Sequence, residues 1–386
     1  MDIVRFTEIL KDKHCYELKK LKYKYPADFD EFLGNLKALY YYELPLSDLR
    51  GEKIVYTPNF SEITSKNLRL LLKDQTQSFA IKSAEQEIVS TCAIENIDIS
   101  RESVRNILRG FAPVNEQENR ILGLKKGFEF ISDKKNTITE ENLFALYNMT
   151  VGDFLSEENR LREGCFYRDA SVFVVSDKIE HEGLDCKKIP EYMNSLIEFI
   201  NADDSINDLV KAAVIHFYIA MVHPYFDGNG RIARLVHLWF LIQKGYQSAL
   251  FIPFSSEIEK SRKKYYEAFT LINENKELSC VTDVTPIISY FINNVYNKVH
   301  TGGVGEEVMS AYKEMLGAGN VTEKENELWQ FVLSFYGTDS FSTKQLEKDF
   351  GGAAYATIRG FVLKFEKYGL LTSEKYSNRV KYRCLK

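Results

Sequence analysis

The chain has 386 residues, of which 45% are hydrophobic and 13% aromatic. This length and composition predict two or three folded domains and exclude a disordered chain. The net charge of -5 is small, but residues 342–386 carry a balance of +6 and the remaining residues one of -11, so a basic C-terminal unit follows an acidic body.

The six cysteines are scattered, with neither a CxxC pair nor the spacing of a zinc site. This usage favours a reducing compartment over a disulfide scaffold. Charges come too early in MDIVRFTEILKDKH for a signal peptide, and no uncharged apolar run reaches the roughly 18 residues of a membrane-spanning helix. We therefore expect a cytoplasmic protein without a membrane segment.

In chain order, residues 1–112 are expected to form an N-terminal helical region. Near its end, SAEQEIVSTCAIENI predicts a helix over about residues 83–96. The apolar side chains of this segment recur at helical spacing, at Ile88, Val89, Cys92 and Ala93.

Residues 113–300 keep a helical pattern with one interruption. In SVFVVSDKIEHEGLD, β-branched and aromatic residues lead into a polar turn, which predicts a short β-hairpin over about Val172–Lys187. Further along, INDLVKAAVIHFYIAMV and RIARLVHLWFLIQKGY are apolar on all sides and predict two helices in the core of this domain. The polar stretch HPYFDGNGRIAR, His223–Arg234, joins them.

Glycines in HTGGVG and near residue 318 predict a linker over residues 301–320. Residues 321–386 then predict three helices and two strands around a Ser-Asn turn, the element order of a winged helix. The expected fold is mainly α: a helical core with a short β-hairpin, an N-terminal helical region and a C-terminal winged helix. Winged helices serve either to bind DNA or as protein-binding and dimerisation modules. Phosphate contacts would come from the basic residues of its third helix and strands, Arg359, Lys364, Lys367, Lys375, Arg379, Lys381 and Arg383.

The stretch HPYFDGNGRIAR has the residue types of a phosphate site. Gly228, Asn229 and Gly230 allow backbone conformations in which successive N–H groups point into one concavity. The helix expected to begin here adds its own unpaired donors and partial positive charge. Arg231 and Arg234 share one face of its first turn, so the stretch describes a site for several phosphates.

Asp227 and His223 complete this chemistry. One carboxylate is enough to hold Mg²⁺ bound to a nucleotide, because phosphates and water fill the other coordination positions. A neutral imidazole beside bound phosphate can take a proton from an attacking hydroxyl. These residue types predict phosphoryl or nucleotidyl transfer.

HPYFDGNGRIAR resembles the signature of the Fic/Doc family, HPFx[D/E]GNGRxxR, at every polar position, with Tyr225 where Phe is usual. The resemblance implies an adenylyltransferase, which moves AMP from ATP to a hydroxyl of a target protein and releases pyrophosphate. It implies His223 as the base, Asp227 as the Mg²⁺ ligand and Arg234 at the γ-phosphate. The remaining phosphate contacts would come from Gly228, Asn229, Gly230 and Arg231.

Two further segments are similar to parts of this family. TCAIEN, Thr91–Asn96, matches [S/T]xxxE[G/N], the pattern of the inhibitory helix in class II Fic proteins. This implies that Glu95 pairs with Arg234 and keeps it from the γ-phosphate. GCFYRDASVFVV is similar to the approach to the family's flap, so the hairpin would hold a target protein by strand addition. In SSEIEKSRKKYYEAF, Tyr265 and Tyr266 are candidate neighbours of the adenine.

Three alternatives stay open on the sequence alone. The chain could be a DNA-binding transcriptional regulator whose Fic core senses nucleotide. It could transfer another phosphate-bearing group, such as phosphocholine, UMP or a whole phosphate. It could also remove AMP, with Glu95 positioning a water molecule. The identity of the target and the oligomeric state, including a homo-oligomer, are left open as well.

Overall fold

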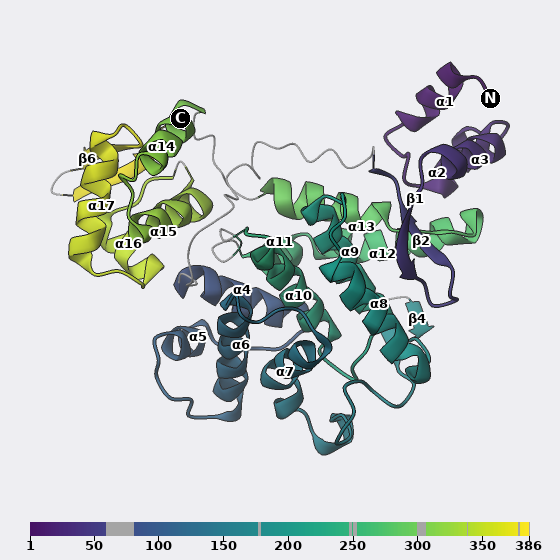
Figure 1. The fold of residues 1–386 in the computed structure, drawn as a ribbon, viewed down its shortest axis with the longest axis horizontal. Coiled ribbons are helices and arrows are strands. Elements are labelled where there is room, and N and C mark those ends of the chain that lie inside the picture. Colours follow the sequence, from purple (N-terminus) through teal and green to yellow (C-terminus); the bar gives the residue numbers. More distant parts are fainter. Residues whose placement is uncertain are drawn as a thin grey trace.

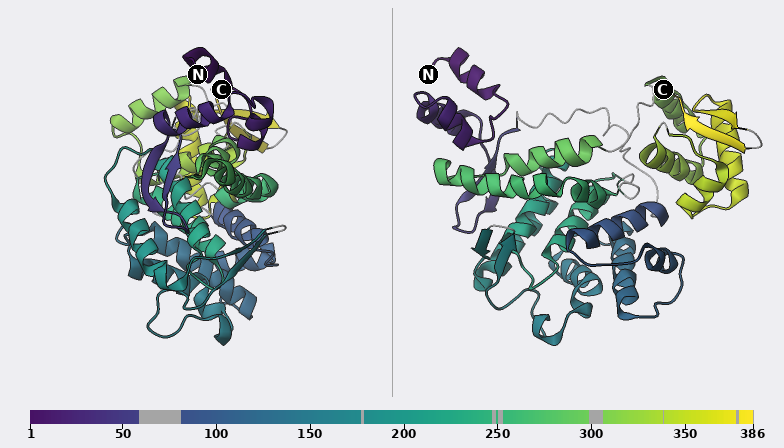
Figure 2. Two further views of the ribbon diagram at one scale, coloured as in Figure 1. Left: turned by 90° about the vertical axis from the view of Figure 1, so that its right-hand side faces the viewer. Right: turned by 180° about the vertical axis from the view of Figure 1, so that it is seen from behind.

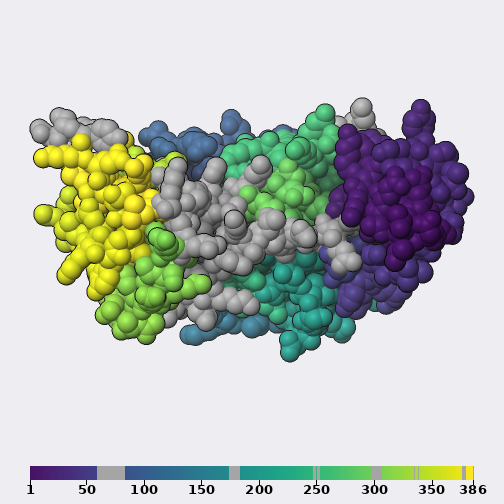
Figure 3. All heavy atoms as spheres, turned by 90° about the horizontal axis from the view of Figure 1, so that it is seen from above, coloured from purple at the N-terminus to yellow at the C-terminus, as the bar shows by residue number. Residues whose placement is uncertain are grey.

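The computed structural model describes residues 1–58, 81–176, 179–246, 249, 253–298, 306–337, 339–376 and 379–385. Most of these residues are helical, so the fold is mainly α, as the sequence predicts (Figure 1). An N-terminal unit and a C-terminal unit lie at opposite ends of a central helical body (Figures 2 and 3). No helix in these ranges combines the length and the apolar composition needed to cross a bilayer.

The N-terminal unit begins with three short helices, α1 (Ile3–Leu10), α2 (Leu18–Lys24) and α3 (Phe29–Leu39). They bury a small core of their own, which consists of Phe6, Ile9, Leu18, Leu21, Phe29, Phe32, Leu33 and Leu36. Helix α2 packs on α12 (Arg262–Ser279) of the central body, which fixes the unit at one end of the molecule.

Strands follow these helices, which corrects the expectation of a helical region over residues 1–112. Strand β1 (Tyr42–Ser47) pairs antiparallel with β2 (Lys53–Tyr56), and β2 pairs in parallel with β5 (Thr282–Asp283). In β1 the buried leucines alternate with exposed residues, and the proline between them lacks the N–H that a helix needs. Residues 59–80 of the expected helical region lie outside the described residues.

The central body consists of helices packed around α9 and α10, with α4 along one side (Figure 1). Its helices are α4 (Ile81–Ile94), α5 (Arg101–Leu108), α6 (Glu116–Ser132), α7 (Glu140–Thr150), α8 (Ile189–Asn201), α9 (Asp208–Val222), α10 (Asn229–Gln243), α11 (Phe254–Lys260), α12 and α13 (Thr285–Tyr290). Short 3-10 turns lie at Gly152–Phe154, Glu157–Asn159, Cys186–Lys188 and Tyr296–Lys298, and a π-helical turn at Phe291–Val295 extends α13.

Helices α9 and α10 are the two that the sequence predicts to be most buried, and nearly every residue of both is buried. They pack against each other, and the polar loop of residues 223–228 connects them. Because both ends of this loop continue into well-packed helices, its side chains are held in fixed positions.

The predicted hairpin is present as β3 (Phe173–Ser176) and β4 (Ile179–Glu182), which pair antiparallel from Phe173 opposite Glu182 to Ser176 opposite Ile179. Residues 177 and 178 at its turn lie outside the described residues. Its strands do not belong to the sheet of β1, β2 and β5, so their backbone edges are not occupied by that sheet.

The C-terminal unit contains α15 (Glu323–Phe331) with a π-helical extension (Val332–Tyr336), α16 (Thr343–Phe350) and α17 (Tyr355–Lys367). Strands β6 (Leu371–Tyr376) and β7 (Arg379–Cys384) follow and pair antiparallel, and Phe341 forms a bridge to Tyr382. Helix α16 packs against α4, so this unit contacts the central body at α4.

Part of the expected linker over residues 301–320 is helix α14 (Glu306–Gly317), which corrects that expectation. Its apolar side chains recur at helical spacing, and Tyr312 is buried with its ring 5.6 Å from the Trp329 ring and 6.4 Å from the Phe365 ring. Residues 301–305, which carry the predicted glycine-rich stretch, lie outside the described residues.

Candidate active site

His223 is the first residue after α9 and begins the loop to α10. Its backbone is left-handed, with φ 54° and ψ 60°, and its N–H donates to the carbonyl of Ile219 at 3.0 Å. For a residue with a Cβ this conformation costs about 1–2 kcal/mol. The packed helices on both sides therefore hold the His223 backbone in a conformation that it would rarely adopt alone.

Asn229 closes the loop with its side chain. Its Oδ1 accepts from the N–H of Tyr225 at 2.9 Å, and its Nδ2 donates to the carbonyl of the same residue at 2.8 Å. Gly228 precedes it with φ 80°, and a Cβ there would lie 2.5 Å from Val151 Cγ1. The backbone N–H groups of the first turn of α10 have no acceptor within the helix, which leaves them as donors for an anion.

Tyr225, the departure from the usual Phe, packs inward. Its ring stacks on that of Tyr147, with centroids 3.8 Å apart and planes 7° apart. The Tyr225 hydroxyl has no hydrogen-bond partner among the described residues, and burial raises its pKa. The extra oxygen is thus accommodated in the core without reaching the loop surface.

Asp227 and Arg231 lie side by side at the start of α10. Asp227 Oδ1 accepts from the N–H of Gly228 at 2.6 Å, and Oδ2 lies 3.2 Å from Arg231 Nη2. The Asp227 side chain is 55% exposed, whereas Arg231 is buried. No group of three or more His, Cys, Asp or Glu side chains in the described ranges could hold a metal by itself. The single carboxylate fits Mg²⁺ that arrives with phosphate and water ligands.

Arg234 is buried and contacts α4. Its Nη2 donates to Glu95 Oε1 at 2.7 Å and to the Thr91 carbonyl at 3.1 Å, while its Nε donates to Thr91 Oγ1 at 2.8 Å. The Arg234 side chain is 4% exposed and that of Glu95 29%. The structure therefore brings together the two residues that the sequence pattern pairs, and it adds Thr91 as a second partner.

The Glu95 carboxylate is held in its charged form. Burial alone would raise its pKa, but the nearby charge and hydrogen bond of Arg234 outweigh burial, so the pKa is lowered overall. A Cβ at Gly230 would collide with the same carboxylate, so glycine at this position lets Glu95 approach the start of α10. Helix α4 ends at Ile94, just before Glu95, and the next residue, Asn96, is left-handed with φ 56°.

Helix α4 is also fixed by polar contacts to α11. Glu87 accepts from the N–H of Ser255 at 2.8 Å and from its hydroxyl, and Gln86 Nε2 donates to Ser256 Oγ at 3.1 Å. Burial raises the pKa of Glu87 to about 6. These contacts hold α4 between α10 and α11 and so set the position of Glu95.

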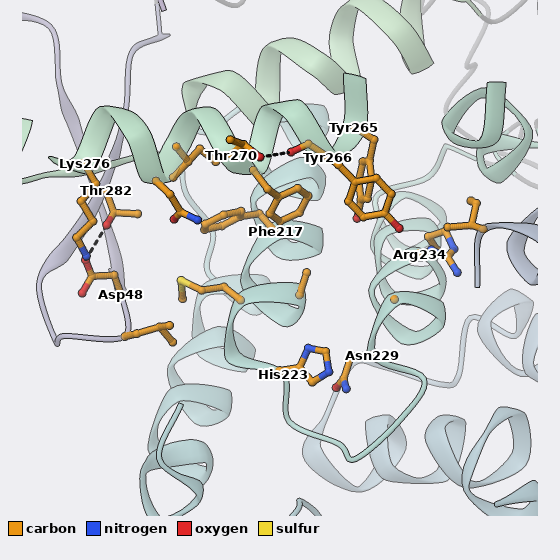
Figure 4. Close-up of a pocket in the computed structure, with 18 of the residues that line it drawn as sticks. Asp48, Phe217, His223, Asn229, Arg234, Tyr265, Tyr266, Thr270, Lys276 and Thr282 are labelled. Carbon is orange, nitrogen blue, oxygen red and sulfur yellow. Dashed lines mark hydrogen bonds and ion pairs between the residues drawn. The ribbon is translucent and has the colours of Figure 1, made fainter. Parts of the chain in front are cut away.

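A cavity of about 570 Å³ opens beside these groups. Its lining includes His223, Asn229, Gly230, Glu95 and Arg234, and Figure 4 shows Arg234 on the side opposite Asp48. Aromatic side chains also line it, namely Phe217, Tyr265, Tyr266 and Phe269. Its size and its mixture of apolar walls with a few charged groups are typical of a small-molecule site.

The far end of the cavity is closed by polar residues from the strand region. Asp48, after β1, accepts from Lys276 Nζ at 2.5 Å and from Thr282 Oγ1 at 2.6 Å, and Figure 4 shows these three side chains at the end opposite Arg234. Asp48 is buried, and its pKa is lowered because hydrogen bonds from these donors outweigh burial. This network ties the β1–β2 turn to α12.

Comparison with known proteins identifies the segment that carries the loop. Residues 137–241 match the model of the Fic/DOC family. The chain therefore contains a Fic/DOC domain. The matched residues include the β3–β4 hairpin and His223–Arg234, while α4 with Glu95 lies outside them.

Curated relatives share this domain over part of their length. The chain is 26% identical over 231 residues to the protein adenylyltransferase Fic of Aedes aegypti, which covers 55% of this chain and 41% of that protein. It is 27% identical over 222 residues to the protein of the same name from Nematostella vectensis, and this match covers 55% of this chain and 47% of that protein. The chain thus spans less than half the length of these relatives.

Solved structures of Fic proteins also align with the chain. Fic-1 of C. elegans (residues 134–508) aligns at 18% identity over 82% of this chain and 85% of that one, with a TM-score of 0.49. A Fic family protein from Desulfovibrio desulfuricans G20 aligns at 18% identity over 78% of this chain and 86% of that one, with a TM-score of 0.48.

The sequence did not predict two parts of the site around the loop of residues 223–228. One is Asp48 with its strand turn, which closes the cavity from a region expected to be helical. The other is Arg168, a buried arginine that donates to the His223 carbonyl at 2.8 Å. The only signal for Arg168 was its place in GCFYRDASVFVV, just before the hairpin.

Proposed function

We propose that the chain is a protein adenylyltransferase, which transfers AMP from ATP to a hydroxyl side chain of another protein and releases pyrophosphate. The observation that carries the proposal is one cavity whose lining combines His223, the N-terminus of α10 and Arg234. The names of the curated relatives support the same activity. An imidazole beside a phosphate site suits transfer to a hydroxyl, since the base and the electrophile must lie close together.

In this proposal the polar residues and glycines of His223–Arg234 each have a separate task. His223 Nε2 or Nδ1 accepts the proton of the target hydroxyl as its oxygen attacks the α-phosphorus. The N–H groups of Gly228, Asn229 and Gly230 and the Arg231 guanidinium bind phosphate oxygens, and Arg234 binds the γ-phosphate. Asp227 would hold Mg²⁺, which when bound neutralises charge on the phosphates.

The target protein is proposed to dock on the β3–β4 hairpin. An extended segment can pair with a free strand edge through its main chain, which fixes its position whatever its side chains are. The hairpin's separation from the other sheet supports this use. The loop that begins at His223 lies beside the stem that leads into the hairpin, because the Arg168 N–H donates to the Pro224 carbonyl at 3.0 Å.

We further propose that Glu95 inhibits the enzyme, as in class II Fic proteins. The carboxylate occupies the guanidinium that would bind the γ-phosphate, with the two groups 2.7 Å apart. ATP then competes with a partly buried anion for Arg234, and binding without this contact leaves the α-phosphate poorly oriented. The resting chain is expected to have low activity.

The test uses ATP labelled either at the α- or at the γ-phosphate, together with Mg²⁺. Wild type, Glu95→Gly and Glu95→Gly with His223→Ala are compared. AMP transfer predicts protein labelled from α-labelled ATP only, strongest in Glu95→Gly and absent when His223 is also replaced. Label from the γ-phosphate would instead identify a kinase-like transfer. Absence of label in every variant would favour a nucleotide-sensing regulator.

A second function is proposed for the C-terminal unit, namely binding DNA as a winged helix. Three helices, the Phe341–Tyr382 bridge and the β6–β7 pair follow one another in the order of that fold. Basic side chains are exposed on α17 and the strands, at Arg359, Lys367, Lys375 and Lys381. By contrast, Lys364 and Arg383 are engaged by Glu325 and Glu374 at 2.7 and 2.6 Å.

A further inference from the structure

Arg168 is a buried cation whose three side-chain hydrogen bonds all go to backbone carbonyls. Its Nε donates to the His223 carbonyl at 2.8 Å, its Nη1 to Ala170 at 2.6 Å and its Nη2 to Leu184 at 2.6 Å. The Arg168 backbone N–H donates in addition to the Pro224 carbonyl at 3.0 Å. The residue is 2% exposed and has no ion pair with a carboxylate among the described residues. Burying a charged group costs free energy unless hydrogen bonds compensate for the lost contacts with water.

The carbonyls that Arg168 contacts belong to two different parts of the site. His223 and Pro224 begin the loop of the Fic/DOC domain. Ala170 and Leu184 lie on the two stems of the hairpin, just outside the pair in which the Gly183 N–H donates to the Val172 carbonyl at 2.9 Å. One rigid guanidinium therefore joins both stems of the hairpin to the peptide of His223.

Gly183 provides independent support for this bridge. A Cβ at this position would lie 2.9 Å from Arg168 Nη2 and 2.9 Å from Val172 Cγ2. Both distances are shorter than real Cβ contacts, so Gly183 leaves the space that the Arg168 guanidinium occupies beside the hairpin stem. The absence of a side chain at Gly183 therefore leaves room for Arg168 between the two stems of the hairpin.

The chemistry of the side chain suits this task. A planar guanidinium presents several N–H groups in fixed directions, whereas a lysine ammonium is a point charge on a flexible stem. Each of the three carbonyls meets a different nitrogen of the guanidinium, an arrangement that the single nitrogen of a lysine cannot reproduce. Burial lowers the pKa of Arg168, although the nearby Cys186 and Asp185 act in the opposite direction. Arginine stays charged even so, because its ordinary pKa is far above neutrality.

We propose that Arg168 is a positioning residue, which fixes the β3–β4 hairpin relative to His223 so that a docked target strand presents its hydroxyl to the imidazole. This inference rests on the proposed adenylyl transfer. Arg168 is not among the described residues that line the cavity, so it acts through the hairpin and the His223 peptide and leaves ATP binding alone. A displacement of about 1 Å between acceptor and base can reduce transfer about 100-fold.

The test compares two fates of AMP in one reaction. The full-length Glu95→Gly chain is the enzyme, and the full-length His223→Ala chain, made with a different mass tag, is the protein acceptor. From α-labelled ATP we measure AMP attached to the acceptor and AMP released to water, each with its pyrophosphate. A variant that merely contains less folded enzyme lowers both products equally, so their ratio reports positioning.

In Arg168→Lys we expect the ratio of protein-bound to free AMP to fall at least 10-fold, with the KM for ATP within twofold of the parent. Gly183→Ala, which pushes on Arg168 without replacing it, should shift the ratio in the same direction. The matched control is Arg160→Lys, because Arg160 also donates to two carbonyls, those of Leu155 and Asp153, but is exposed. An unchanged ratio in both Arg168→Lys and Gly183→Ala would overturn the inference.

Hydrogen exchange of the hairpin amides separates this inference from the proposed function. In the absence of ATP, we expect the amides of residues 172–184 to exchange at least 10-fold faster in Arg168→Lys than in the parent or Arg160→Lys. If the parent attaches no AMP to protein, the proposed function fails, and unchanged exchange in Arg168→Lys then refutes the bridge on its own. If Arg168→Lys does not fold, Gly183→Ala decides both measurements.

Discussion

Replacing Glu95 by glycine is expected to activate the enzyme, because among the described residues it removes the one carboxylate that is paired with Arg234. The pair is 2.7 Å long, and Arg234 is almost fully buried, so solvent screens the interaction little. A hydrogen bond between charged groups contributes about 1.5–3 kcal/mol, which corresponds to roughly a 10- to 150-fold change in an equilibrium. We expect the initial rate of AMP labelling to rise by a factor in that range.

The assay measures protein-bound label from α-labelled ATP at a fixed ATP concentration below the KM. Glu95→Gln keeps an oxygen that can accept from Arg234 but removes the charge, so its rate should lie between those of wild type and Glu95→Gly. Glu95→Gly combined with His223→Ala should give no label. These comparisons separate the loss of the charge from the loss of the side chain.

The control is Glu85→Gly, inside α4. Glu85 is buried and paired with Arg105 at 2.7 Å, so its replacement removes an ion pair and places a helix-weakening glycine within α4, whereas Glu95 follows the last helical residue, Ile94. Its rate should stay within about threefold of wild type, because Arg234 keeps its partner. Equal activation by Glu85→Gly would show that loosening of α4, and not release of Arg234, causes the effect. A Glu95→Gly chain that labels at the wild-type rate would refute the inhibitory role altogether.

Three other predictions concern stability and DNA binding. Gly228→Ala should lower the free energy of unfolding by about 2–5 kcal/mol in urea titrations, since the residue combines a φ of 80° with a Cβ position 2.5 Å from Val151, and unchanged stability would contradict this packing. Burial raises the pKa of Glu87 from 4.5 to about 6, so between these pH values the folded chain keeps a proton that the unfolded chain has lost, and stability falls by up to about 2 kcal/mol as pH rises. In Glu87→Gln the difference in unfolding free energy between pH 4.5 and pH 7 should shrink by that amount. Asp283, whose pKa burial also raises to about 6, keeps its own contribution to this difference. An unchanged difference would place the Glu87 pKa near its ordinary value. Arg359→Ala should weaken binding to duplex DNA equally for different sequences and reduce the salt dependence by about one phosphate contact, and a gel shift with no binding by wild type would exclude the DNA proposal.

The loop could be predicted from sequence because its chemistry is local. Glycines, arginines and the flanking apolar helices occur within one short stretch, and the spacing of each residue determines its place at the start of α10. The Glu95–Arg234 contact joins residues far apart in sequence, yet the TCAIEN pattern pointed to it through a family resemblance.

The missed features depend on contacts that no local pattern encodes. Arg168 looks like one more charged residue in a loop, and only the folded chain places the His223 carbonyl and both hairpin stems around it. Strand β2 pairs with β5, which lies more than 200 residues further along, so its neighbouring sequence does not indicate this part of the sheet. The glycines beside α14 favour a linker, although Tyr312 packs in the core of the C-terminal unit.

Thr91 bears on how the proposed inhibition by Glu95 can be relieved. Its hydroxyl and carbonyl accept from Nε and Nη2 of Arg234, so the guanidinium keeps its orientation when the Glu95 carboxylate is absent. Glu95 itself lies at the end of α4 and is partly exposed, whereas the body of the helix is tied to α11 through Glu87. The simplest route to activity is therefore a rotation of the Glu95 side chain with α4 in place. ATP would then meet an arginine that is already oriented, and little further ordering would be needed for its γ-phosphate to bind.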